Sequence, residues 1–242
     1  MLRSFKADLH IHTCLSPCTE LDMSPREITH RARAEKIDIL GICDHNSAEN
    51  APAVMKAARK FDIHVLPGIE VTSREEVHVL ALFDDLDDAL KLQEYIYENL
   101  PGKNDEEAFG MQVIVNEKDE VLGFNDRLLI GATTIPLEEV IRIIHRFRGI
   151  GIASHIDRES FSIIGQLGFV PEGIELDALE ISPLISYEEA IKKYKNYPLT
   201  CSSDAHYPDE IGKGFTTFLL KEGTVTEIKK ALKREDGREL VH

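Results

Sequence analysis

The alternation of short apolar runs with helix-forming segments is the feature that most constrains how this chain can fold. Several of these runs are apolar nearly throughout, as strands buried on both faces of a parallel sheet are, and they occupy residues 37–43, 63–69, 150–153 and 178–182. Segments with helical periodicity lie between them. One follows Ser24 and Pro25, which fit the N-cap and first position of a helix. The repeat predicts βαβ units and a mainly parallel sheet in an α/β barrel.

The length and composition fit one domain over residues 1–242. The chain is 43% hydrophobic, which is enough for one sizeable core. No run is long enough to span a membrane, and the N-terminus shows no signal-peptide pattern, so we expect a soluble, cytoplasmic protein with no membrane partner. A net charge of −15 argues against non-specific binding to nucleic acid. Bound metal ions would still allow a small phosphorylated substrate.

The strand–helix alternation breaks between residues 101 and 134. Two short runs of strand-forming residues, 112–115 and 121–124, flank a polar turn in this stretch. We predict an inserted β-hairpin over residues 110–125. It would serve as a lid or a dimer contact, or it would be a passive insertion.

Most of the apolar runs have a His, Asp or Glu residue at their C-terminal end, and these are residue types that bind metal ions. In a parallel barrel these ends gather at one face, where active sites are built. The residues concerned are His10, His12, Asp44, His45, Glu70, His155, Asp204 and His206. His78 fits less well because it stands at the start of its run, residues 77–83. Either that strand is antiparallel or its boundary lies elsewhere.

This mixture of imidazoles and carboxylates suits Zn, Mn or Fe(II) better than Ca or Mg. The set of eight candidate ligands exceeds the four or five positions of one ion: His10, His12, His45, Glu70, His78, His155, Asp204 and His206. At least two ions are therefore expected, with a carboxylate such as Glu70 between them. Such sites favour hydrolysis of phosphate esters by a metal-activated hydroxide, since the ions hold the phosphoryl oxygens. We predict Asp204 and His206 to be catalytic as well as ligating.

The order of these short motifs resembles the polymerase and histidinol phosphatase (PHP) family. The motifs span residues 8–206 and read DLHIHT, CDHN, GIE, EVHVL, ASH and SSDAH. The resemblance implies a distorted seven-stranded (β/α) barrel, two or three divalent ions (Zn, Mn or Fe) and phosphoesterase activity. It also implies three ion positions. The first is held by His10, His12, Glu70 and Asp204, the second by Glu70, His78 and His155, and the third by His45 and His206.

The loop after His12 departs from the family pattern. In many relatives this loop supplies a His or Asp ligand, but residues 13–18 contain neither. Cys18 could replace it as a thiolate, Asp44 could contribute, or the third position could be weak. The four cysteines form no CxxC pair, so we expect packed thiols or, at Cys18, a ligand.

Two cations are candidate substrate contacts. Arg158, three residues after His155, suits bidentate binding of a phosphate and is a further catalytic candidate. The alternative for Arg158 is a surface ion pair with Asp157 or Glu159. Lys213, between two glycines, is the second phosphate contact that we predict.

The predicted substrate is a small phosphorylated molecule: a phosphomonoester, a nucleoside bisphosphate or a short oligonucleotide end. The acidic composition makes long duplex nucleic acid the least favoured partner. Two other functions remain open, an inactive PHP module that serves as an interaction scaffold and a metal-dependent amidohydrolase. Retention of eight ligands argues against the first. The amidohydrolase alternative lacks a candidate for a carbamylated lysine, because no lysine lies at a predicted strand end.

Overall fold

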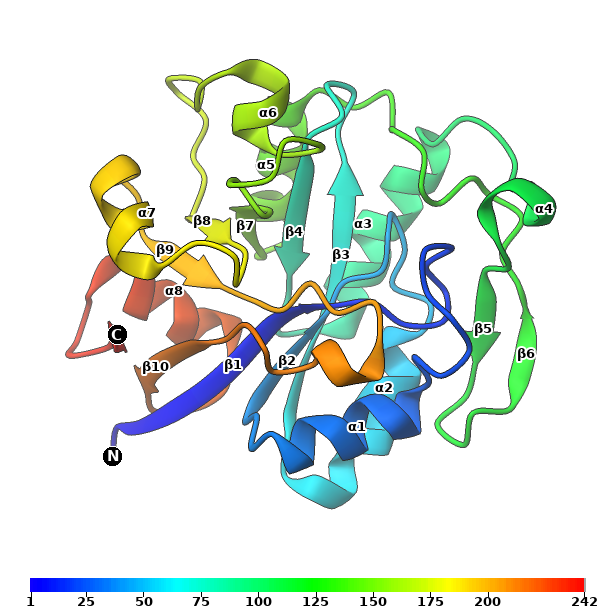
Figure 1. The fold of residues 1–242 in the computed structure, drawn as a ribbon, viewed down its shortest axis with the longest axis horizontal. Coiled ribbons are helices and arrows are strands. Elements are labelled where there is room, and N and C mark those ends of the chain that lie inside the picture. Colours follow the sequence, from blue (N-terminus) through cyan, green and yellow to red (C-terminus); the bar gives the residue numbers. More distant parts are fainter. Residues whose placement is uncertain (242) are drawn as a thin grey trace.

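The apolar runs of the sequence form one curled sheet of nine strands in the computed structural model, which describes residues 1–241 (Figure 1). The strands follow one another across the sheet in the order β11, β10, β1, β2, β3, β4, β7, β8 and β9. Their bounds are β1 Arg3–Ile11, β2 Ile39–Ile42, β3 His64–Thr72, β4 His78–Leu82, β7 Ile150–Ala153, β8 Ala178–Ile181, β9 Leu199–Cys201, β10 Thr216–Leu220 and β11 Glu239–Val241.

Seven of these strands make the wall of a distorted barrel, which confirms the predicted fold class. The segment after β9 returns to β1 through a parallel bridge between Ala205 and Ile11, and this bridge closes the ring. The amide of His12 donates to the carbonyl of Ala205 over 3.1 Å at the same seam. Strands β10 and β11 extend the sheet on the other side of β1, both in antiparallel pairing.

Strand β4 is the antiparallel member of the barrel wall. It pairs in opposite directions with β3 and with β7, whereas β1, β2 and β3 are parallel, as are β7, β8 and β9. A turn closed by the amide of Ser73 and the carbonyl of Val77 joins β3 to β4, and it is too short for the crossover that parallel pairing requires. Because β4 starts where its parallel neighbours end, His78 lies opposite Thr72 at the same rim of the barrel. The antiparallel alternative for this run is thereby confirmed.

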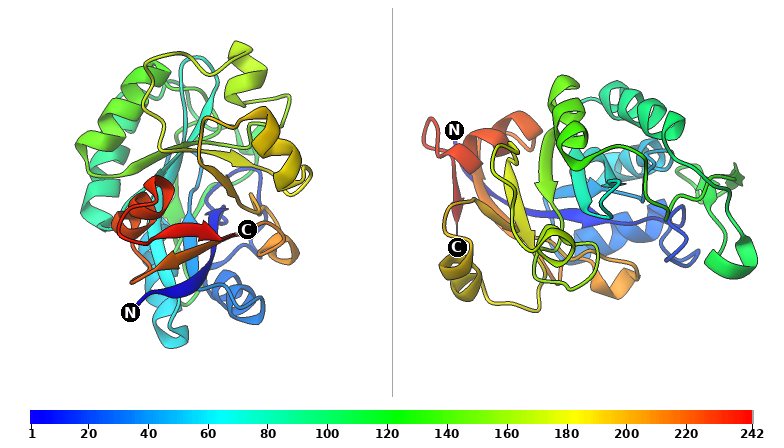
Figure 2. Two further views of the ribbon diagram at one scale, coloured as in Figure 1. Left: turned by 90° about the vertical axis from the view of Figure 1, so that its left-hand side faces the viewer. Right: turned by 90° about the horizontal axis from the view of Figure 1, so that it is seen from above.

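Helices cover the outside of the barrel, as Figures 1 and 2 show. The longer ones are α1 Pro25–Ala34, α2 Ala51–Ala58, α3 Leu86–Glu98, α5 Leu137–Arg146, α7 Tyr187–Lys193 and α8 Val225–Lys233. The short ones are α4 Glu106–Phe109, α6 Ile163–Leu167 and the 3₁₀ turns η1 Arg59–Phe61 and η2 Pro208–Glu210. Ser24 accepts a hydrogen bond from the amide of Glu27 and so caps α1 as predicted. No helix among the described residues is long and apolar enough to cross a membrane.

Two apolar clusters stabilise this arrangement. The larger one joins the inner faces of α1, α2, α3, α5 and α7 to strand residues such as Leu40, Val71 and Leu179. The second contains Phe5, Leu66, side chains of β4 and β7, and one face of α8. The polar centre described below therefore lies on a barrel whose remaining buried residues are mostly apolar.

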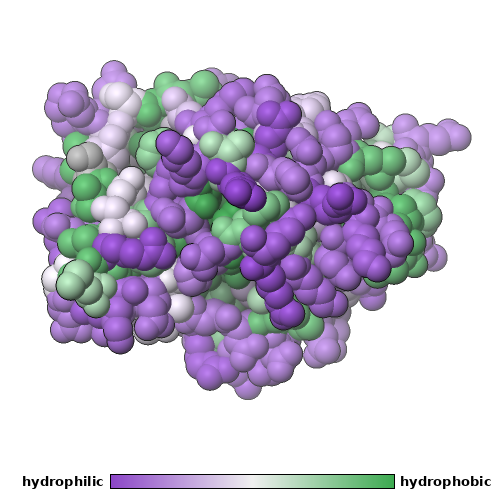
Figure 3. Space-filling view, turned by 90° about the horizontal axis from the view of Figure 1, so that it is seen from below, coloured by the Kyte–Doolittle hydropathy of each residue, from purple (hydrophilic) through white to green (hydrophobic). Residues whose placement is uncertain are grey.

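The insertion forms the predicted hairpin, β5 Val113–Val115 and β6 Val121–Phe124, as a separate two-stranded sheet. Val113 and Val115 pack on Cys14, and the side-chain amide of Asn50 donates to the carbonyl of Val113 over 3.0 Å. Strand β6 exposes apolar side chains, with Leu122 66% exposed, at the end of the molecule where Figure 3 shows a group of apolar residues.

Candidate metal centre

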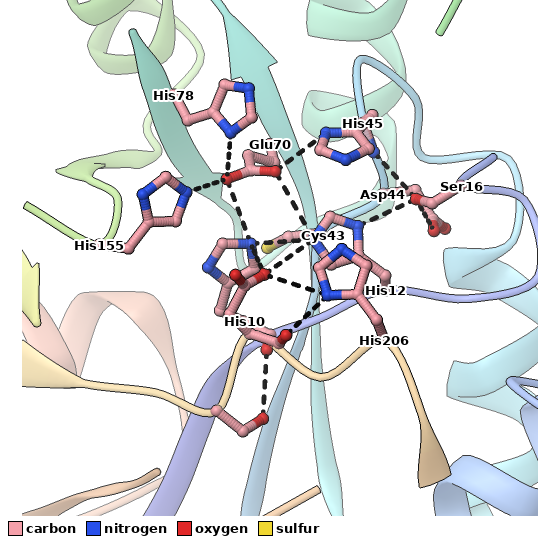
Figure 4. A network of polar contacts seen from close by, with 12 residues as sticks. His10, His12, Ser16, Cys43, Asp44, His45, Glu70, His78, His155 and His206 are labelled. Atoms are coloured by element: carbon pink, nitrogen blue, oxygen red, sulfur yellow. Dashed lines mark hydrogen bonds and ion pairs between the residues drawn. The ribbon is translucent and has the colours of Figure 1, made fainter. Parts of the chain in front are cut away.

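Glu70 lies at the middle of the predicted ligands (Figure 4). Its Oε1 is 3.0 Å from His78 Nδ1 and 3.3 Å from both His10 Nε2 and His155 Nε2. Its Oε2 is 3.0 Å from His45 Nδ1. Glu70 does not end its strand as expected, because pairing with β4 extends β3 to Thr72. Both oxygens of one carboxylate thus face different groups of imidazoles, as a bridging ligand would.

His10 and His12 point at a common position from the end of β1. Their Nε2 atoms are 3.1 Å apart, and each lies 3.2 Å from Asp204 Oδ1. Ligand atoms around a tetrahedral ion with bonds of 2.0–2.1 Å lie about 3.3 Å from one another. The register between β1 and β2 shifts between Asp8 and Ile11, and such an irregularity re-aims side chains beside functional sites. The spacing therefore matches a position for one small cation.

Partners outside this group fix which ring nitrogen faces inward. His10 Nδ1 lies 3.0 Å from Glu180 Oε1, and His12 Nδ1 lies 3.0 Å from Ser16 Oγ. Ser16 donates its own proton to Asp44, so its hydroxyl accepts from His12. With both Nδ1 atoms protonated, the two Nε2 lone pairs face each other and the carboxylates. A group of acceptors with no donor among them needs a cation at its centre.

The electrostatics of the centre agree with this requirement. Burial opposes the charged form of His10, but the negative charges of Asp204, Glu180 and Glu70 outweigh burial and raise its pKa. Burial likewise opposes ionisation of Glu70, but the positive charges of His78 and His10 hold its pKa well below the usual range. A positive charge is therefore favoured beside an ionised Glu70.

Several buried polar atoms here have no hydrogen-bond partner among the described residues. They include Glu70 Oε1 and the Nδ1 atoms of His45, His78 and His155. The 3.0 Å approaches of His78 Nδ1 and His45 Nδ1 to the Glu70 carboxylate are ion-pair contacts without hydrogen-bond geometry. An unpaired buried polar group is costly, so a cluster of them marks a place where another partner belongs. His155 and Asp204 also have positive φ angles of 30° and 51°. Strained backbone of this kind concentrates at functional sites, and here both residues reach the centre from loops.

Cys18 lies beside three imidazoles. Its Sγ and ring nitrogens of His12, His45 and His206 all lie within 4.8 Å of one another. Burial raises the pKa of the thiol, but the charges and hydrogen bonds of His45 and His206 outweigh burial and lower it to about 7. Asp44 does not face this cluster, because its carboxylate accepts hydrogen bonds from the backbone and hydroxyl of Thr13 and from Ser16. Of the two residues considered for the third position, the structure brings Cys18 to it.

A cavity of about 340 Å³ opens over the centre. The side chains that line it include Cys18, Glu70, Ile130, Arg158, Phe161 and Asp204. Arg158 pairs with Asp204, not with Asp157 or Glu159 as its alternative role required. Lys213 lies outside the lining and forms a surface ion pair with Asp209 at 3.4 Å, so the structure does not place it as the predicted phosphate contact.

Two residues of this site, Ser16 and Phe161, were not predicted from the sequence, which left open whether Glu180 supports a ligand or is purely structural. Ser16 holds His12, but an isolated serine in a loop carries no signal of its own. Phe161 has a φ of 58° and stacks on His78, with ring centroids 4.6 Å apart. Glu180, which ends a predicted strand, is the partner of His10 Nδ1 and also accepts from the amide of His155. Asp8, which the sequence offers as a possible carboxylate partner for the rings of His10 and His12, instead accepts hydrogen bonds from the amides of Ser203 and Gly212.

Comparison with known proteins yields one family and a small group of relatives. The PHP domain model matches residues 8–233. The chain is 31% identical over 80 residues to a 5′-3′ exoribonuclease of Haemophilus influenzae, a match covering 32% of this chain and 28% of that protein. It is 31% identical over 100 residues to an uncharacterised protein of Methanocaldococcus jannaschii, which covers 38% of this chain and 58% of that protein. The chain thus spans less than two thirds of these relatives.

Among solved structures, the lesion-specific endonuclease Q of Pyrococcus furiosus superposes with a TM-score of 0.74 at 19% identity, covering 98% of this chain and 58% of that one. A complex of endonuclease Q with a 27-mer duplex that carries an abasic lesion gives a TM-score of 0.72 at the same identity and coverage. These structures share the fold. The family match extends over most of the chain, and this protein therefore belongs to the PHP domain family.

Proposed function

We propose that this protein hydrolyses phosphate esters of nucleotide type, either a nucleotide or the end of a short oligonucleotide, with divalent Zn, Mn or Fe(II). The observation that carries the proposal is Glu70, buried at the floor of a cavity with imidazoles at 3.0–3.3 Å from its oxygens. The family and its structural neighbours support a metal-dependent hydrolase that acts on ester bonds.

The residues present fit at least two ions. One would be held by His10, His12, Glu70 and Asp204, whose ligand atoms converge on one position. A second would be held by Glu70, His78 and His155, since the two ring nitrogens lie 3.0 and 3.3 Å from Glu70 Oε1. When bound, ions here supply Lewis acidity and lower the pKa of water.

The protein's own contribution is to orient these groups and to hold the phosphate. Glu180 and Ser16 fix the tautomers of His10 and His12, so both rings present lone pairs inward. The side chain of Arg158 is 39% exposed and reaches the cavity, where its guanidinium can bind two phosphate oxygens. Its present partner, Asp204, would be shared with an ion, which leaves the guanidinium available to substrate.

The cavity favours a small substrate. A volume of about 340 Å³ is at the lower end of ordinary ligand sites, and its wall includes the part-exposed aromatic ring of Phe161. Aromatic rings of this kind stack on nucleobases at a gain of about 1–3 kcal/mol per base. The net charge of −15 opposes long duplexes, even though endonuclease Q binds one.

The test is a substrate panel on protein reconstituted with Mn, Zn or Fe(II). We expect turnover of nucleoside phosphates or short oligonucleotides, and its loss in Asp204→Asn with the fold retained. Asp209→Asn changes an exposed carboxylate in the 3₁₀ turn η2, five residues further on; it is the matched control and should keep full activity. Metal-loaded protein that is inactive on all mono- and diesters would refute the proposal and favour the scaffold role. Turnover of amide substrates alone would favour an amidohydrolase.

A further inference from the structure

The loop after β1 presents the Cys18 thiol to the cavity in a fixed position. Its backbone folds back on itself, with the amide of Ser16 donating to Thr13 and that of Thr19 donating to Ser16. The Ser16 hydroxyl ties the loop to Asp44, and Cys18 lines the cavity together with His45 and His206. Side chains from three separate segments therefore meet at one point.

Two imidazoles are available to Cys18. His206 Nδ1 lies 2.8 Å from the carbonyl oxygen of Asp204, which can only accept, so Nε2 carries the free lone pair. His45 is 5% exposed and its Nδ1 lies 3.0 Å from Glu70 Oε2, so Nε2 is the ring nitrogen that is left for a further partner. The third neighbour, His12, is committed elsewhere, since its Nε2 faces Asp204 and its Nδ1 faces Ser16.

We propose that Cys18 is a thiolate ligand of a further divalent ion, held together with His45 and His206. One thiolate and two imidazoles form a soft set, so this position would take Zn or Fe(II) in preference to Mn or Mg. The inference rests on the proposed metal-dependent function and adds to it that one ion position differs in chemistry from the carboxylate-rich positions around Glu70.

The other cysteines show what a merely packed thiol looks like in this fold. Cys14 and Cys43 are buried, and their Sγ atoms lie 3.8 and 3.6 Å from the carbonyls of Val113 and Leu9. Cys18 differs from both, since it is only partly buried, faces the cavity and lies among imidazoles. Cys201 is also partly buried, but it belongs to none of the groups of possible metal ligands among the described residues. It therefore serves as the control cysteine.

The test combines spectroscopy, metal content and thiol reactivity of the intact protein. Metal-free protein titrated with Co(II) should develop a thiolate-to-cobalt charge-transfer band that is absent in Cys18→Ser and retained in Cys201→Ser. Cys18→His restores an imidazole and should keep the ion while losing the band, which guards against a variant that merely misfolds. In wild type, Zn should slow alkylation of Cys18 by at least about tenfold, as followed by mass spectrometry of each cysteine.

Equal alkylation of Cys18 with Zn and with chelator, or an unchanged cobalt band in Cys18→Ser, would overturn the inference. So would alkylation of Cys18 with no change in metal content, because a thiol that is modified while every ion stays bound does not ligate an ion. These results separate the two proposals. A protected Cys18 in a protein without phosphoesterase activity refutes the function alone, and an active enzyme with an unprotected Cys18 refutes the thiolate site alone.

Discussion

Replacing Glu180 by Gln tests whether the centre depends on partners that never touch an ion. Glu180 Oε1 lies 3.0 Å from His10 Nδ1 and also accepts from the amide of His155. The side chain is 1% exposed, so water cannot substitute for it. Gln keeps the shape and one acceptor, but it removes the charge and adds a donor that can turn His10 to the wrong tautomer.

The magnitude follows from the type of hydrogen bond lost. A hydrogen bond to a charged group contributes about 1.5–3 kcal/mol and a neutral one about 0.5–1.5 kcal/mol. The difference of roughly 1–1.5 kcal/mol corresponds to about a tenfold change in an equilibrium constant. Replacing a residue that hydrogen-bonds to a metal ligand, without itself touching the ion, commonly weakens ion binding about 10- to 100-fold. We therefore expect Glu180→Gln to weaken binding at the His10 position about tenfold.

The assay is competition for Zn with a chromogenic chelator of known affinity. Glu172→Gln makes the same change of charge at an exposed position and serves as the control. Thermal unfolding in excess chelator reports the stability of each ion-free variant, so the effect on ion binding is measured separately from the effect on stability. If Glu180→Gln binds Zn as tightly as Glu172→Gln does, then Glu180 does not support the centre and the tautomer argument fails.

Three further predictions follow from other contacts. Arg158→Ala should lower kcat/KM by roughly 10- to 100-fold without reducing metal content, while Lys213→Ala changes neither; equal effects of the two would refute the phosphate role. Removing ions by chelation should lower the unfolding temperature by about 5–10 °C if the free ion had stood at ~100 times its Kd, and an unchanged Tm in calorimetry would contradict binding to the folded state. Burial raises the pKa of Asp177, but hydrogen bonds from His145, at 2.7 Å, and from the amide of Gly151 outweigh burial and lower it. Asp177 therefore adds stability above its ordinary pKa, and this stability is lost as pH falls through the lower folded value. Asp177→Asn should cost about 1–3 kcal/mol near pH 7, and a cost that persists undiminished in denaturant titrations below about pH 4 would refute this.

The sequence predicted those parts of the site that a local pattern specifies. Apolar runs located the barrel strands, and the polar residue types next to them located His10, His12, Glu70 and Asp204. The direction of β4 could not be decided from its own residues, since it depends on the short turn to β3 and on pairing with β7.

Contacts between residues that are far apart in the sequence could not be predicted from local patterns. Glu180 meets His10 across 170 positions of the chain, and only the closed barrel brings them together. Ser16 and Phe161 act through a side-chain hydroxyl and a strained backbone in loops, where periodicity carries no information. Lys213 stands between two glycines in sequence, yet the fold directs it to a surface pair with Asp209.

The backbone hydrogen bonds that close the barrel lie next to the candidate metal ligands. The amide of His12 bonds to the carbonyl of Ala205, and the amide of Ala205 bonds to the carbonyl of His10 over 3.3 Å. These bonds lie directly beside the pair of imidazoles and the carboxylate of Asp204 that converge on one position. Bringing Ala205 back to the end of β1, which is far from it in the sequence, costs conformational entropy. Two backbone hydrogen bonds offset this cost only in part. An ion bound across the same seam would join the first strand to the segment after the last barrel strand, so ion binding and barrel closure would stabilise each other.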